Sequence, residues 1–138
     1  MTGNELQKML CKALCAEATV TGLREGFWRV STPFRFPDGD SYTLYLQQIA
    51  SGGLRISDAG STMMHLSYEN DIDKLREGTR GRLLQQVLSE SDMQEDDGEF
   101  FVDSAIEDLG KSMFRFGQAL TRIHDLTFLN RLRAESTF

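Results

Sequence analysis

The sequence is poor in the residues that mark several specialised classes of small protein. Its 138 residues include only two cysteines, two histidines and two prolines. Cys11 and Cys15 are one helical turn apart, a spacing typical of reduced thiols in a core and not of a disulfide framework. With only His65 and His124 besides, no ligand spacing for a structural zinc site is present, so we expect no metal and no cofactor.

Long apolar runs and nucleotide-binding motifs are also missing. No apolar run exceeds a few residues, and the N-terminal MTGNELQKML lacks a basic region followed by an apolar core. Neither a membrane span nor a signal peptide is therefore predicted, and we expect a cytoplasmic protein. The absence of GxxxxGK[ST] and GxGxxG patterns leaves nucleotide binding without support.

What remains is an ordinary globular composition with an excess of acidic residues. Hydrophobic residues make up 40% of the chain, charged residues 26%, and the net charge is −6. These values predict one globular domain over residues 1–138. The acidic balance argues against general phosphate binding and favours a protein partner with a basic surface.

Local patterns predict an α+β fold. Apolar residues spaced by three and four predict helices over residues 4–17 and 72–88, a short helix after residue 60 and a long one from residue 106. Two glycines weaken the middle of the segment over residues 72–88, so we expect a break near Gly78 to Gly81. Alternation predicts strands over residues 27–36, 41–50 and 54–58, joined as an antiparallel meander, with a further hairpin or strand near residue 100. We expect an N-terminal helix, a three- to four-stranded antiparallel sheet, and a helical C-terminal half packed on one face.

Two strands carry more specific expectations. Pro33 lacks an N–H donor, so the strand over residues 27–36 is predicted at a sheet edge or around a bulge, with the edge preferred. The strand over residues 41–50 is apolar on both sides, which predicts a central strand that is covered on both faces.

The first predicted strand sends aromatic and basic side chains to opposite faces. Trp28 and Phe34 alternate with Arg29 and Arg35. Sheets that bind single-stranded nucleic acid place aromatic rings and cations on the same surface. The opposite placement here favours a core-facing aromatic row with solvated arginines behind it, so nucleic acid is not expected as a direct ligand. Binding of a single strand on the Arg29 and Arg35 face stays as an alternative.

The corner between the third predicted strand and the next helix is the best candidate for a ligand site. Its glycine permits a sharp bend, and its Asp or Ser side chain can cap the exposed amides of the helix. If the chain holds a small ligand, we expect it at Asp58, Gly60, Ser61 and His65.

A metal-dependent hydrolase or nuclease is a second alternative. Asp38, Asp40 and Asp58 would have to converge, because such enzymes use several carboxylate oxygens to hold the metal and activate water. The catalytic lysine that nuclease cores of this type carry on the central strand is missing from Leu44-Tyr45-Leu46-Gln47-Gln48. Turn formation and helix capping account for the aspartates, so we assign no catalytic residue and expect no enzyme.

The segment ESDMQEDDGE, residues 90–99, concentrates negative charge. We expect Glu95, Asp96, Asp97 and Glu99 to contact the basic partner.

The last predicted helix carries an apolar stripe that includes Met113, Phe116 and Leu120. A stripe of about three heptads fits either a globular core or a seam between two copies, so a homodimer through this helix is a further expectation.

Residues 32–66 resemble a known family. The motifs are Thr32-Pro33-Phe34, the turn Asp38-Gly39-Asp40, and a strand that ends in Ser57-Asp58-Ala59-Gly60. They are similar to the domain of unknown function numbered eighteen twenty-eight, whose corner tends to read Thr-Asp-Asp-Gly, so Ala59 departs from the pattern. The resemblance implies a small bacterial or phage-borne protein and brings no established chemistry.

Charge, size and the missing active site together favour a non-enzymatic accessory protein or inhibitor that binds another protein. A phage-encoded antagonist of a host defence complex, of the anti-CRISPR type, is the form that the resemblance favours.

Overall fold

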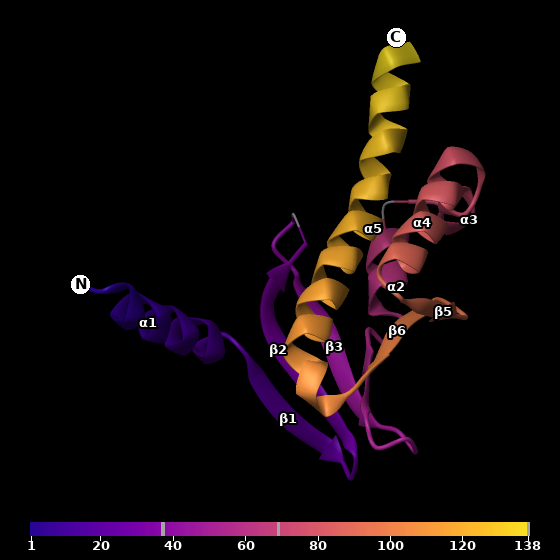
Figure 1. Cartoon of the computed structure of the whole chain (residues 1–138). Helices are drawn as coiled ribbons and strands as arrows, with labels where there is room; N and C mark the ends of the chain where they lie inside the picture. Colours follow the sequence, from indigo (N-terminus) through magenta and orange to yellow (C-terminus); the bar gives the residue numbers. More distant parts are fainter. Residues whose placement is uncertain (37, 69, 138) are drawn as a thin grey trace.

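The computed structural model describes residues 1–36, 38–68 and 70–137, and side chains as far as Thr127. The fold is α+β, as predicted, with an N-terminal helix, an antiparallel sheet and a helical C-terminal half (Figure 1). The helical elements are α1 (Gly3–Ala16), α2 (Ser61–Ser67), α3 (Ile72–Leu75), α4 (Gly78–Glu90), the 3₁₀ turn η1 (Ile106–Asp108) and α5 (Leu109–Thr137). The strands are β1 (Thr19–Arg24), β2 (Phe27–Arg35), β3 (Ser41–Gln48), β4 (Leu54–Ser57), β5 (Gln94–Asp96) and β6 (Glu99–Ser104).

The sheet has six strands in the order β1-β2-β3-β4-β6-β5, and every pair is antiparallel. The predicted meander is β2-β3-β4, and the hairpin predicted near residue 100 is β5-β6. The strand that the sequence did not predict is β1, because Thr19 to Gly22 also suits a helix end. Pairing with β2 converts these β-branched residues into a strand.

β2 is not an edge strand, which corrects the preferred position of Pro33. It lies between β1 and β3, and its register with β3 shifts between Ser31 and Arg35. Pro33 sits within this irregularity, where the ladder does not need its missing N–H.

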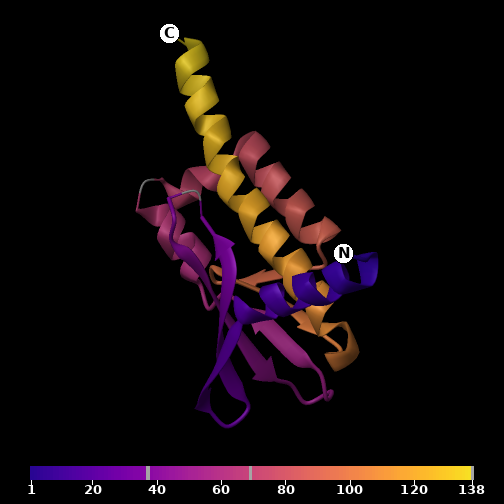
Figure 2. The ribbon, with the colours of Figure 1, turned by 90° about the vertical axis from the view of Figure 1, so that its left-hand side faces the viewer.

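One face of the sheet is the core face. Leu44, Leu46 and Ile56 are buried there against α5, which contributes Phe116 and Leu120. Helix α4 packs beside α5 (Figure 2). The stripe proposed as a dimer seam is therefore used, from Phe116 to Ile123, in the core of its own chain.

The other face of β3 is open, which corrects the expectation that this strand is covered on both sides. Thr43 and Tyr45 are only half-buried, and Arg29 beside them on β2 is exposed. The two faces differ because all the packing contacts of α5 and α4 are made on the core side.

Helix α1 stands away from the sheet (Figure 1). A capping box at its start, in which Thr2 and Glu5 each receive the other's backbone N–H, explains why it begins there. All its residues are exposed, including Cys11 and Cys15, so the expected core position of these free thiols is wrong. No helix in the described part of the chain is long and apolar enough to cross a membrane.

Candidate functional site

The corner after β4 is a structural element. Asp58 is fully buried, and its carboxylate accepts backbone N–H bonds from Gly60 at 2.9 Å, Thr62 at 3.2 Å and Phe100 at 2.9 Å. Burial raises the pKa of Asp58, and the three N–H donors oppose this effect. A carboxylate with these bonds holds the start of α2 against β6 and has no free face for a ligand.

The remaining corner residues separate into a turn position and a pocket. Gly60 precedes α2 with a φ of 83°, which favours glycine. Ser61 and His65 line a cavity of about 320 Å³ together with Phe36 and Asp40. Two of the four candidate residues therefore line a pocket. Asp58 and Gly60 instead stabilise and shape the backbone of the corner.

Asp38 and Asp40 meet His65, and not Asp58. The turn between β2 and β3 brings both aspartates to His65 on the last turn of α2, where one ligand atom from each of the three side chains lies within 4.8 Å of the other two. Asp58 does not belong to this group, so the three-aspartate cluster of the nuclease alternative does not form within the described residues. The sequence indicated His65 as a corner residue but not as a partner of the two aspartates, because it follows the turn by 25 residues and meets it only through the fold.

The open face of the sheet combines aromatic and basic side chains. Directly paired residues of neighbouring strands lie on one face, and the register aligns Thr21, Arg29, Tyr45, Ser57 and Phe101 in one row across five strands. A second row contains Arg24, Phe27, Gln47, Arg55 and Asp103. We call the surface formed by these two rows the open face.

Contacts within the open face order its rings. Phe27 and Tyr45 stack with centroids 5.5 Å apart and planes 10° from parallel. The guanidinium of Arg24 lies 4.3 Å from the centroid of Phe27, and that of Arg55 lies 4.3 Å from the centroid of Phe101. The open face therefore carries two groups of stacked planes, one of Arg24, Phe27 and Tyr45 and one of Arg55 and Phe101.

Charge is graded across this face. Arg55 pairs with Asp103 at 2.7 Å, and Glu99 lies further along β6, so the β6 side carries the acidic groups. In the described part of the chain, Arg24 and Arg29 form no ion pair. The β1 and β2 side of the open face is therefore locally basic on a chain of net charge −6.

Sequence patterns predicted only half of this surface. Trp28 and Phe34 pack against the core, as the alternation predicted. Phe27, Tyr45 and Phe101 point to the other side of the sheet, where they share the open face with Arg29. Apolar residues on both sides of the strand over residues 41–50 are the signal for this surface in the sequence. That pattern also fits a strand covered on both faces, which is what the sequence analysis predicts.

The acidic hairpin β5-β6 uses half of its predicted contact residues internally. Glu95 pairs with Arg76 and is largely buried, and the hydroxyl of Ser57 donates to Glu99 at 2.5 Å. Asp96 and Asp97 are exposed at the turn. Of the four residues, Asp96 and Asp97 form no ion pair within the described residues, Glu99 keeps its charge but is held by Ser57, and Glu95 is paired with Arg76.

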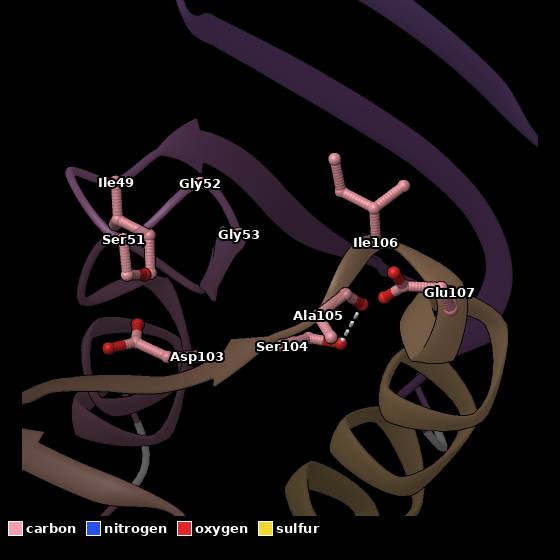
Figure 3. A pocket seen from close by; sticks show the side chains of 9 residues that line it. All are labelled: Ile49, Ser51, Gly52, Gly53, Asp103, Ser104, Ala105, Ile106 and Glu107. Carbon is pink, nitrogen blue, oxygen red and sulfur yellow. Dashed lines mark hydrogen bonds between the residues drawn. The ribbon is translucent and has the colours of Figure 1, made fainter.

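A further pocket of about 390 Å³ lies where β4 begins and β6 ends (Figure 3). Asp103 and Glu107 border it with their carboxylates, and Gly52 and Gly53 form the opposite wall. The hydroxyl of Ser104 is bonded to the carbonyl of Ala105 at 2.9 Å. With no histidine, cysteine or cation in its lining, this pocket carries no acid–base or nucleophilic constellation.

Comparison with sequence families matches residues 32–123 to the domain of unknown function DUF1828. The chain belongs to this family. The DUF1828 region contains the pocket lined by Ser61 and His65, the Asp58 corner and most of the sheet. Helix α1 and strand β1 precede it. No curated protein and no solved structure matches the chain. Ala59, where the family pattern tends to have aspartate, has a φ of 51°. Aspartate is enriched at such positive angles, so conformation explains the acidic residue without catalysis.

Proposed function

We propose that the protein binds single-stranded nucleic acid on the open face of its sheet. The observation that supports this is the shared face of Phe27, Tyr45 and Phe101 with Arg24 and Arg29. Bases stack on aromatic rings and guanidinium planes, and arginines track the phosphates.

The acidic net charge does not oppose this proposal. Counterion release depends on the cations that contact phosphates, and not on the total charge of the chain. Arg24 and Arg29 are exposed and pair with no carboxylate of the described residues, and Arg35 extends the same side, where it donates to the carbonyl of Gly39. Three phosphate contacts of this kind predict a modest slope of about −2 in a plot of log K against log salt.

The test is fluorescence anisotropy with labelled oligo-dT and oligo-U of about 15 nucleotides, a length within the usual range of site sizes. Loss of one stacking platform should weaken binding about 5- to 100-fold, so Tyr45→Ala and Phe27→Ala are expected to fall in that range. Arg29→Ala should weaken binding and reduce the salt slope. Arg82→Ala, which changes an exposed arginine on α4, a helix that packs beside α5, should bind like the unmodified chain.

Two results would reject the proposal. One is no measurable binding of either oligonucleotide at low salt. The other is binding that Tyr45→Ala and Arg29→Ala leave unchanged while both variants keep the unfolding midpoint of the unmodified chain.

Protein binding by the hairpin β5-β6 is a second candidate function. Asp96 and Asp97 protrude at its turn and complement a basic partner, as an inhibitor of a host defence complex would require. Asp96→Lys changes this charge and leaves the ion pair of Glu95 with Arg76 in place. If the variant captures the same proteins from a host extract as the unmodified chain does, in equal amounts, this surface is not the binding site.

A further inference from the structure

We propose that Asp38, Asp40 and His65 bind a first-row divalent transition-metal cation, with Zn²⁺ and Mn²⁺ as the ions that suit this donor set. The inference is independent of nucleic-acid binding by the open face.

The distances between the three side chains support a shared ion. The Nε2 atom of His65 lies 3.0 Å from Oδ2 of Asp38, and its Nδ1 atom lies 3.5 Å from Oδ2 of Asp40. Ligands about 2.0–2.2 Å from a zinc ion are separated from one another by similar distances. The two carboxylates face different ring nitrogens, but one ligand atom from each of the three side chains lies within 4.8 Å of the other two. Rotation of one carboxylate toward the nitrogen that faces the other would bring all three ligand atoms onto one ion.

Both ring nitrogens of His65 face carboxylate oxygens. A carboxylate has acceptors only, and a neutral imidazole has one N–H donor and one nitrogen lone pair. In the neutral ring, one of the two contacts would place a lone pair against an anion. A divalent cation between the groups would replace that contact with coordination.

The fold holds these groups in place before an ion binds. Oδ1 of Asp38 accepts the backbone N–H of Asp40 at 3.0 Å, which leaves Oδ2 toward the histidine. The ring of His65 stacks on Phe36 with centroids 4.0 Å apart and planes 5° from parallel, and its side chain is 15% exposed. Such support fixes the orientation of a ligand ring.

The donor set selects the class of cation. One imidazole and two carboxylates suit zinc or manganese, whereas magnesium prefers oxygen ligands and keeps its waters. Three protein ligands leave at least one coordination position, and the adjoining cavity is lined by Asp40 and His65 themselves. A small anion or a water molecule would occupy that position.

Isothermal titration calorimetry of the chelator-treated full chain with ZnCl₂, MnCl₂ and MgCl₂ tests the site. We expect saturable binding of one Zn²⁺ or Mn²⁺ per chain and weaker binding of Mg²⁺. Asp40→Asn and His65→Gln should each weaken binding at least about tenfold, since changes outside the ligand shell already cost 10- to 100-fold.

Asp73→Asn is the matched control. Asp71-Ile72-Asp73 repeats the Asp-x-Asp turn, with the N–H of Asp73 bonded to Asp71 at 3.0 Å, but belongs to no group of three metal-binding side chains in the described chain. This variant should bind like the unmodified chain.

A second measurement follows the imidazole nitrogens of His65 by NMR, in which Zn²⁺ should shift and Mn²⁺ should broaden their signals. Unsaturable heats, or equal affinity in Asp40→Asn and the unmodified chain, would overturn the proposal. A histidine signal that responds to pH and not to the metals would also overturn it, because a proton on His65, and not a metal ion, would then supply the positive charge between the two carboxylates.

Discussion

Oδ1 of Asp58 accepts the backbone N–H of Phe100 at 2.9 Å, and the N–H of Asp58 in turn donates to the carbonyl of Phe100 at 3.1 Å. This pair joins the end of β4 to β6, which lies 42 residues further along the chain. The same carboxylate receives the N–H of Gly60 and of Thr62. One buried side chain thus fixes the sheet and the start of α2, and places Ser61 and His65 in their pocket.

Asp58→Ala should therefore destabilise the fold substantially. The substitution leaves three N–H donors without their acceptor in a buried corner, and a buried unsatisfied group costs about 1–3 kcal/mol. Urea denaturation should show a loss of unfolding free energy of at least about 2 kcal/mol. Asp97→Asn is the control, because Asp97 is exposed with a φ of 49° that asparagine accepts, and its effect should stay within about 0.5 kcal/mol.

The stability difference between the unmodified chain and Asp58→Asn should decrease as pH rises. Burial raises the pKa of Asp58 in the folded state above the ordinary value of 3.8, so between these two values the folded state binds more protons than the unfolded state. The contribution of this group is complete below 3.8 and is lost as pH rises through the folded-state pKa. Asparagine does not titrate, so unfolding of both proteins in urea across this window isolates the effect. A difference that grows with pH would show that the N–H donors outweigh burial.

Gly81→Ala and Gly110→Ala should have opposite effects although both glycines are helical. A Cβ atom at Gly81 would lie 2.2 Å from the carbonyl oxygen of Arg76, whereas one at Gly110 would meet nothing within 4 Å. The first substitution should cost about 1–3 kcal/mol in unfolding free energy, and the second should stabilise by up to about 1 kcal/mol. Thermal and urea unfolding of the two variants would measure the contrast. Equal effects would mean that helix propensity alone decides.

The sequence predicted the elements whose signals are local. The alternation in β2 and the stripe of α5 each lie within one segment, and each appears in the structure. Of the turn predicted at residues 37–40, residue 37 lies outside the described residues, and the N–H of Gly39 donates to the carbonyl of Phe36. The break predicted near Gly78 to Gly81 is also confirmed, since α3 ends at Leu75 and α4 begins at Gly78. Gly81 allows the close approach of the Arg76 carbonyl at this point.

The candidate sites depend on pairings that no local pattern records. His65 meets Asp38 and Asp40 because α2 returns over the β2-β3 turn. Phe101 joins Tyr45 because β4 pairs with both β3 and β6, which sets the register of residues more than 50 positions apart. Sequence alternation gives the phase of each strand, but the choice of which phase faces the core is made by the helices that pack there.

Leu10→Ala and Leu120→Ala provide the last prediction, since they remove equal side chains from opposite environments. Leu120 is 0% exposed in the core, and Leu10 on α1 is 59% exposed. Leu120→Ala should lower the unfolding free energy by about 2–5 kcal/mol. Leu10→Ala should change it by no more than about 0.5 kcal/mol, because its surface is already in water.

Urea denaturation at two protein concentrations, with sedimentation velocity on the same samples, checks both values. Concentration matters because α1 exposes further apolar side chains, namely Leu6, Met9 and Leu14. If a second copy of the chain covered them, the free energy of unfolding would rise with protein concentration. If Leu10→Ala destabilises the fold as strongly as Leu120→Ala does, the apolar side of α1 is buried in an assembly. If it has no effect at either concentration, the core formed by the sheet, α4 and α5 accounts for the stability of the fold without α1.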